Sequence, residues 1–213
     1  MNIELDHFFI LTDPEAPQAN LVSGIGLVEG SRNSHPGQGT ANRRFFFSNS
    51  TLELLYIRDA NEAKNGRGSR LGLVERHDDP IASPFGLIVR NISKSAGSPF
   101  PGWQYCPEYF RDDQCFLVGE NSDLLEEPLC ICMPRNLSRP NNLNQTDNPL
   151  WSLTELRISV PTLSPSLPLE TISNCEGIRL QLNAPHKLEL VFNEEKSGLS
   201  LDFRPDLPLI ARW

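Results

Sequence analysis

Two short apolar segments, each holding one ionisable side chain, limit most strongly how this chain can fold. Residues 5–10 form a strand pattern around His7, and residues 51–57 form another around Glu53. Alternate side chains of a strand point to the same face, so both groups share a face with apolar residues. Burying them is costly unless they are paired, hydrogen-bonded or bound to a metal. We expect neighbouring strands that form half of a cation site. The alternatives are a core histidine bonded to backbone and a glutamate on a solvated face.

The charge balance excludes one class of partner. The 213-residue chain has a formal net charge of −8, whereas binding a nucleic-acid backbone requires a basic face. The N-terminal residues lack the basic start and apolar core of a signal peptide. No segment approaches the roughly 18 apolar residues of a membrane helix. We therefore expect a cytoplasmic protein with no nucleic-acid or membrane partner.

The five cysteines follow no regular framework, and their number is odd. Both properties favour reduced thiols over structural disulfides. Cys130 and Cys132 alternate along a probable strand, so their sulfurs share one face, where we expect them to act as small buried hydrophobes.

The order of predicted elements repeats along the chain. The first unit reads strand, helix, strand, strand, strand, over residues 3–11, 16–24, 26–30, 44–47 and 51–57. A second, looser unit covers residues 84–133, and residues 134–149 read as a linker rich in Asn, Pro and Ser. We therefore divide the chain into residues 1–133, which hold units one and two, and residues 150–213, a partly degenerate third unit on the same sheet system.

The third unit echoes the first in two places. Residues 188–191 repeat the Leu-Glu-Leu pattern of residues 52–55, and residues 153–155 match residues 5–7. Such an echo indicates duplicated units, although short apolar strands also resemble each other by chance. The chain is thus predicted to be an α+β protein.

A glycine-rich loop lies between the two opening strand patterns. Gly37 and Gly39 allow positive φ and exposed amide groups, Thr40 and Asn42 add short polar side chains, and Arg43 adds charge. Together with His35, these residues are candidates for gripping a carboxylate or phosphate at a cavity mouth. The alternative is a hairpin connection whose Asn and Thr satisfy its own backbone.

The chain resembles the glyoxalase-like domain of the vicinal oxygen chelate superfamily, to which bleomycin-resistance proteins and dioxygenases belong. The resemblance covers residues 3–57 and partly returns from residue 153. It is carried by Leu5-Asp6-His7, by Tyr56 at the end of the second strand pattern, and by the loop His35-Pro36-Gly37-Gln38-Gly39-Thr40-Ala41-Asn42. It implies repeated βαβββ units that form curved, mostly antiparallel sheets around a cavity.

The resemblance also implies a divalent metal in that cavity, with His7 and Glu53 as ligands. Alignment with unit three adds Glu155 and Glu189, which would give an oxygen-rich site suited to Mn²⁺, Fe²⁺ or Mg²⁺, with Zn²⁺ and Ni²⁺ also considered. Alignment with unit two adds only Gly86 and an apolar residue near Leu129, neither of which binds metal.

The function implied is that of a metal-assisted lyase, isomerase or dioxygenase acting on an oxygen-rich or anionic metabolite. Glu53 or Glu189 would move a proton if either were free of the metal. The alternative from another class is a metal-free protein of the drug-resistance type, which binds and sequesters a small molecule. Family members often pair units across chains, so a homodimer is also considered. An ion pair between Arg157 and Glu155 would occupy the Glu155 carboxylate and weaken its assignment as a metal ligand.

Overall fold

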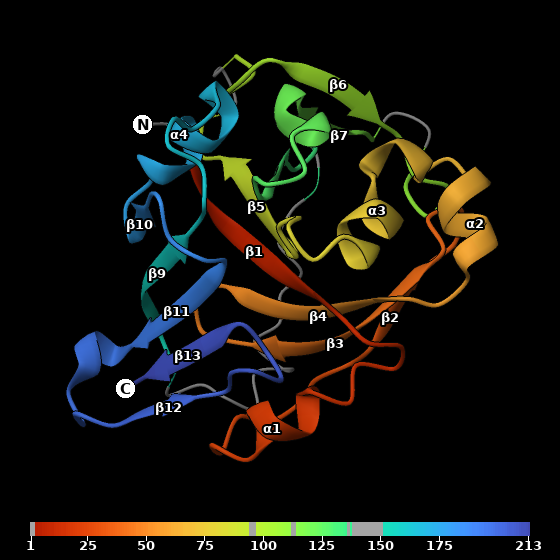
Figure 1. Ribbon diagram of the computed structural model, residues 1–213. Helices are drawn as coiled ribbons and strands as arrows, with labels where there is room; N and C mark the ends of the chain where they lie inside the picture. Colours follow the sequence, from red (N-terminus) through yellow and green to blue (C-terminus); the bar gives the residue numbers. More distant parts are fainter. Residues whose placement is uncertain (1–2, 94–96, 112–113, 136, 138–150) are drawn as a thin grey trace.

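The computed structural model describes residues 3–93, 97–111, 114–135, 137 and 151–213 (Figure 1). Strands dominate and helices are short, so the chain belongs to the α+β class, as predicted. The strands form two sheets, and the larger, mixed sheet curls into a half-barrel.

The larger sheet is built from two similar halves, in the order β2-β3-β4-β1-β5-β8-β7-β6. In each half the first strand pairs in parallel with the last, β1 with β4 and β5 with β8, and the two first strands meet antiparallel. This arrangement is consistent with a repeated βαβββ fold. The elements of the first half are β1 (Ile3–Thr12), α1 (Ala19–Ser23), β2 (Asn33–His35), β3 (Thr40–Phe46) and β4 (Thr51–Ile57). Those of the second half are β5 (Phe85–Asn91), β6 (Gly102–Tyr105), β7 (Phe116–Gly119), the short turn η2 (Glu120–Asp123) and β8 (Leu129–Cys132).

Short helices connect the two halves, and a second sheet follows them. The connecting helices are α2 (Ala60–Asn65), η1 (Ser69–Leu71) and α3 (Leu73–Asp78). The second sheet has the order β10-β9-β11-β13-β12. Its region comprises β9 (Leu153–Ser159), α4 (Leu167–Ser173), β10 (Ile178–Gln181), β11 (Lys187–Phe192), η4 (Asn193–Glu195), β12 (Ser200–Asp202) and β13 (Leu209–Arg212).

The two sheets share one apolar core. Phe47 at the end of the first sheet lies edge-on to Phe192 of the second, with ring centroids 4.8 Å apart. The Asn49 side chain donates to the carbonyl of Leu153 at 2.8 Å and accepts from its N–H at 3.0 Å. The third unit therefore packs on the first while pairing its strands only within its own sheet.

The second half of strand β1, from Phe8 to Thr12, is buried on both faces and separates this core from a second one. Phe8 and Ile10 point into the shared core, whereas Phe9 and Leu11 point to the opposite face, inside the curl of the large sheet. The side chains of one strand thus stabilise the fold on one side and line its interior on the other.

One predicted strand is misplaced. Residues 26–30 were expected to form a strand, but the strand of this region is β2, at Asn33–His35. Gly26 has a φ of +87°, which is not extended backbone. Among the described hydrogen bonds, residues 26–30 make one backbone bond to β3, from the Gly30 amide to the Arg44 carbonyl. Regular strand pairing begins at Asn33, which lies opposite Asn42 of β3. The Asn33 backbone amide also donates to the Asn42 side chain at 2.9 Å.

The expectation of reduced thiols is wrong for two cysteines. Cys106 and Cys115 form a disulfide, because the antiparallel pair β6 and β7 places Tyr105 opposite Phe116 and so brings the next residues together. Cys130, Cys132 and Cys175 are free and buried, as predicted for small hydrophobes.

The predicted linker over residues 134–149 lies mostly outside the described residues. In the ranges that are described, no helix is long and apolar enough to span a bilayer.

Candidate functional site

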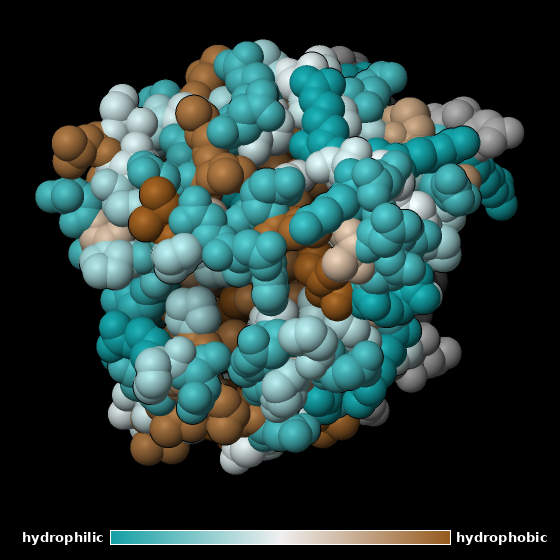
Figure 2. All heavy atoms as spheres, turned by 45° about the vertical axis from the view of Figure 1, so that its right-hand side comes forward, coloured by the Kyte–Doolittle hydropathy of each residue, from teal (hydrophilic) through white to brown (hydrophobic). Residues whose placement is uncertain are grey.

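A cavity of about 390 Å³ lies inside the curl of the large sheet, between its two halves. Apolar and aromatic side chains form most of its wall, among them Phe9, Leu55, Leu71, Leu73, Ile88, Tyr105, Tyr109, Phe110, Phe116, Leu129, Ile131 and Met133. Its polar lining consists of Asp6, His7, Asn33, His35, Gln38, Arg44, Thr51, Glu53 and Arg90. In Figure 2, apolar residues are visible in the hollowed middle of one face, between hydrophilic ones.

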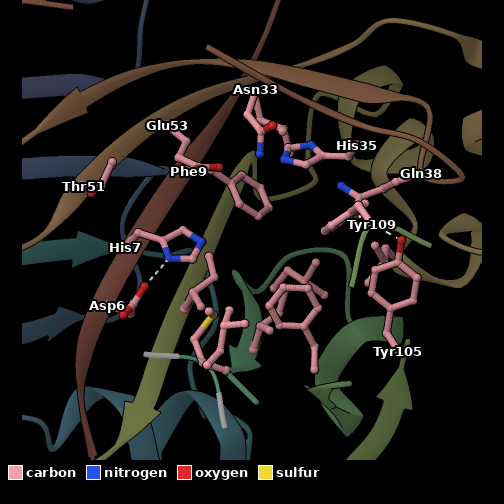
Figure 3. A pocket seen from close by; sticks show the side chains of 18 of the residues that line it. Asp6, His7, Phe9, Asn33, His35, Gln38, Thr51, Glu53, Tyr105 and Tyr109 are labelled. Carbon is pink, nitrogen blue, oxygen red and sulfur yellow. Dashed lines mark hydrogen bonds and ion pairs between the residues drawn. The ribbon is translucent and has the colours of Figure 1, made fainter. Parts of the chain in front are cut away.

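A β-bulge places two consecutive side chains in this cavity. The register between β1 and β5 shifts between Leu5 and His7, so Asp6 is the extra residue. The His7 Nδ1 lies 2.7 Å from Asp6 Oδ1, and the ring extends into the cavity (Figure 3). The Arg90 guanidinium donates to the other Asp6 oxygen. Asp6 is thus fixed from both sides and orients the imidazole.

The surroundings of His7 favour its protonated form. Burial lowers the pKa of His7, but the hydrogen bond to Asp6 and the charges of Glu53 and Asp6 outweigh it, so the pKa is raised above its ordinary value of 6.5. Burial also raises the pKa of Asp6, yet the contacts with His7 and Arg90 hold it far below its usual range. Asp6 is therefore a carboxylate at neutral pH.

Glu53 reaches the same cavity from β4 (Figure 3). Its backbone is in register with Phe9 of β1 and Arg44 of β3. The apolar strand that holds it, residues 51–57, is fixed between these two neighbours. Within the part of the chain that the structure describes, the Glu53 carboxylate makes no hydrogen bond or ion pair of its own. The structure thus brings His7 and Glu53 to one cavity and leaves the carboxylate available.

A chain of hydrogen bonds connects His35 to two tyrosines. The Thr40 hydroxyl lies 2.9 Å from His35 Nδ1 and accepts from the Gln38 amide at 2.8 Å. The Gln38 carbonyl oxygen accepts from the hydroxyls of Tyr105 and Tyr109, each at 3.2 Å. Burial lowers the pKa of His35, with Glu53 opposing and Arg44 adding to the effect, and burial raises the pKa of Tyr105 to about 12. Both groups are neutral at physiological pH.

Most of the predicted substrate-binding loop is used within the fold. The Gly37 amide donates to Glu62 at 2.8 Å, and the Gly39 carbonyl accepts from the amides of Arg58 and Asp59. Asn42 accepts from the Asn33 amide, as the hairpin alternative requires.

Arg43 has several internal partners. Its guanidinium donates to Glu29, to the Ala16 carbonyl at 3.1 Å and to Asn20 at 3.2 Å. Of the six residues proposed for substrate binding, His35 is the one that lines the cavity in the described structure.

Glu155 and Glu189 do not line the cavity. Both belong to the second sheet, where Glu155 pairs with Arg157 at 2.6 Å and with Arg179 at 2.7 Å. Glu189 pairs with Lys187 at 2.6 Å and Arg212 at 2.9 Å. The Arg157–Glu155 ion pair weighed from the sequence is therefore present, and both carboxylates are engaged.

The donors in the cavity fall short of a metal centre. His7 and Glu53 face it, but the positions offered by the second half are Gly86, which lies against the Phe9 ring, and Leu129. No group of three or more His, Cys, Asp or Glu side chains that could hold a metal ion is found among the described residues. A divalent metal remains a prediction of the resemblance.

Several lining residues were not predicted to belong to the site, among them Asp6, Asn33, Gln38, Arg90 and Tyr109. Asp6 and Gln38 lie within the two segments that carry the resemblance, which was the available signal. Tyr109 lies between β6 and β7 of the second half, and no local pattern marks it.

No protein-family model and no curated protein matches the chain. Among solved structures, a hypothetical protein from Staphylococcus aureus matches 100% of this chain over 98% of its own, with a TM-score of 0.63 and 13% identity. A hypothetical protein from Bacillus halodurans C-125 matches 66% of this chain over 100% of its own, with a TM-score of 0.43 and 14% identity. The first match shows a shared fold along the whole chain. The curled mixed sheet is compatible with a glyoxalase-like domain, although neither protein's name states a family.

Proposed function

We propose that this chain is a glyoxalase-like small-molecule enzyme in which His7 moves a proton on a ligand held in the cavity. The observation that carries the proposal is the 2.7 Å contact between His7 Nδ1 and Asp6, with the ring inside the cavity. Histidine is the side chain best suited to take and return protons near neutral pH. A carboxylate on one ring nitrogen leaves the other nitrogen for the substrate.

The polar groups of the cavity suit proton abstraction beside a carbonyl. Although its surroundings favour the protonated form, His7 acts here from its deprotonated form: Nε2 takes the proton from carbon, and the electron pair of the broken C–H bond moves toward the carbonyl oxygen. Neutral His35 and the Asn33 amide also face this cavity and are candidates to donate a hydrogen bond to that oxygen. Return of the proton to a neighbouring atom completes an isomerisation. In an elimination, the leaving group departs from the β-carbon with its bonding electron pair, and His7 gives its proton to that group or to water. The reaction class is therefore an isomerase or lyase.

Proton exchange tests the proposal without knowledge of the natural substrate. Wild-type protein is incubated in D₂O with a panel of hydroxyketones, 2-oxo acids and aminoketones, and loss of the α-proton signal is followed by NMR. We expect catalysed exchange with at least one compound and a fall of about 10²-fold or more in His7→Gln.

An exposed surface pair supplies the matched control. His77 Nδ1 lies 2.9 Å from the carboxylate of the adjacent residue Asp78, in the reverse sequence order and outside this cavity. His77→Gln should therefore exchange at the wild-type rate. Equal exchange by wild type and His7→Gln, or no catalysed exchange with any compound, would contradict the proposal.

The aromatic wall favours a second candidate, a protein that binds a small molecule without converting it. Tyr109 and Phe110 have ring centroids 5.1 Å apart, Phe110 and Phe116 4.8 Å, and Tyr105 stacks on Phe116 at 6.1 Å. Such walls bury apolar ligands effectively. A ligand recovered unchanged, with binding that survives His7→Gln, would support this candidate over the enzyme.

The divalent metal is a separate proposal with its own experiment. Metal content is measured on protein purified without added metal or chelator, and unfolding is followed with Mn²⁺, Fe²⁺, Mg²⁺, Zn²⁺ or Ni²⁺ in large excess. Tight binding would raise stability by a few kcal/mol, and His7→Ala would abolish that rise. No bound metal and no rise would leave the cavity without a metal role.

A further inference from the structure

One end of the cavity, which we call the polar end, is lined by Asp6, His7, His35 and Glu53. Its charged groups differ in how well they are paired. Asp6 is held by both His7 and Arg90. Glu53 is the carboxylate that makes no hydrogen bond or ion pair to any described residue.

The two nearby guanidinium groups are engaged elsewhere. Arg90 donates to Asp6 and to the Leu137 carbonyl at 3.3 Å. Arg44 donates to the Ser31 carbonyl at 2.6 Å and to its hydroxyl at 2.8 Å, and lies over the Phe46 ring at 5.0 Å. Neither forms an ion pair with Glu53, so this carboxylate is free to meet a ligand.

The opposite wall sets the character of the rest of the ligand. Tyr105, Tyr109, Phe110 and Phe116 present a continuous cluster of rings, and the two tyrosine hydroxyls are already used on Gln38. The wall therefore offers apolar ring surface and few free polar groups. A cavity of about 390 Å³ falls within the usual size range of small-molecule sites.

We propose that the cavity takes a small molecule with an aromatic or other apolar body and a cationic, N–H-donating head, such as an amine or amidine, that pairs with Glu53. This inference rests on the proposed function for its cavity and adds the class of ligand. A carboxylate in a partly apolar site gains most from a charge-assisted hydrogen bond. An anionic head would instead be repelled by the Glu53 carboxylate, and Arg43, the loop cation expected to attract it, is used inside the fold.

Three compounds with one shared body test the charge preference: 2-phenylethylamine, 2-phenylethanol and 3-phenylpropanoate. Their affinities are measured by calorimetry at pH 8 on wild type, Glu53→Gln and Glu155→Gln. We expect wild type to bind the amine about tenfold more tightly than the alcohol, and the carboxylate most weakly. Glu53→Gln should remove the advantage of the amine. Glu155→Gln changes the net charge equally on the second sheet and should retain it.

The ranking in wild type does not depend on any variant folding, and circular dichroism verifies the two variants. Tightest binding of the carboxylate, an unchanged amine preference in Glu53→Gln, or no binding of any compound would overturn the inference. Failure of proton exchange with the amine preference intact would remove the enzymatic proposal alone. Exchange that depends on His7, with no preference for the amine, would remove this inference alone.

Discussion

Asp6 and His7 are consecutive residues, yet both side chains line the same cavity, with Oδ1 of the first 2.7 Å from Nδ1 of the second. In a regular strand they would point to opposite faces. The bulge in β1 removes that alternation at a single position. It thereby supplies the imidazole with a carboxylate partner from its own strand, and Arg90 of β5 holds that partner in place.

Asp6→Asn should therefore destabilise the protein at neutral pH. It leaves buried donors of His7 and Arg90 without their charged acceptor, at a cost of about 2 kcal/mol. Because the pKa of Asp6 is held far below 3.8, its stabilisation is present above that value and is lost as the pH falls below it. Urea unfolding of both proteins at pH 7 and at acid pH measures the difference. An equal loss of stability in the surface variant Asp78→Asn would contradict the prediction, because Asp78 lies outside the cavity.

The pKa of His7 should lie above 6.5 and that of His35 below it. Asp6 and Glu53 raise the pKa of His7 against burial, whereas burial lowers the pKa of His35. The stabilisation from His7 is fully present below pH 6.5 and is lost as the pH rises through its folded-state pKa. The stabilisation from neutral His35 is present above pH 6.5 and is lost as the pH falls below that value. Side-chain ¹⁵N NMR of the four histidines resolves both. In Asp6→Asn the pKa of His7 should fall, and an unchanged value would contradict the assigned pairing.

Arg43 is expected to act on stability and not on ligand binding. Its side chain is 10% exposed and joins Glu29, the Ala16 carbonyl and Asn20 to β3. Arg43→Lys keeps the charge but loses this planar set of bonds, at a cost of about 2 kcal/mol. Ligand affinity of the folded fraction should remain at the wild-type value. A fall in ligand affinity without loss of stability would show that Arg43 takes part in binding and contradict this prediction.

The contrast between Glu53 and Glu189 shows how far the sequence could predict the site. Both occur in the same Leu-Glu-Leu pattern, which correctly places each on a strand. Alternation reveals which residues share a face, but not what covers that face. The second half of the large sheet closes over Glu53, whereas Arg157, Lys187 and Arg212 surround Glu189. Sheet order is a property of the whole chain, and no local pattern contains it.

The same limit explains the other differences. The repeated order of elements was readable from turn residues and apolar periodicity, so the class of fold could be predicted. The Asp6 bulge, the wall containing Tyr109 and the Cys106–Cys115 bond depend on register between strands. Register follows from pairings between distant segments, and a single sequence does not show them.

Gly39 should tolerate no side chain, for reasons of packing. Its φ is +72°, and a Cβ there would lie 2.3 Å from the Ala63 amide nitrogen and 2.5 Å from the Asp59 carbonyl oxygen. Gly39→Ala should therefore cost about 2 kcal/mol or more, because backbone must move. Gly26→Ala is the control, since its φ is +87° but nothing lies within 4 Å of the added carbon. Equal losses in thermal unfolding would show that backbone conformation alone matters.

The Cys106–Cys115 bond closes the segment that carries Tyr109 and Phe110 into the cavity. Replacing both cysteines by serine should lower stability by about 2–3 kcal/mol, because the unfolded chain regains the freedom of the closed loop. Affinity for 2-phenylethylamine should also fall, since the aromatic wall is no longer tied to β6 and β7. Cys175→Ala removes a buried free thiol and should change stability alone. Thiol titration of denatured, unreduced wild type should find three free thiols; five would show that the bond does not form and would remove the basis of this prediction.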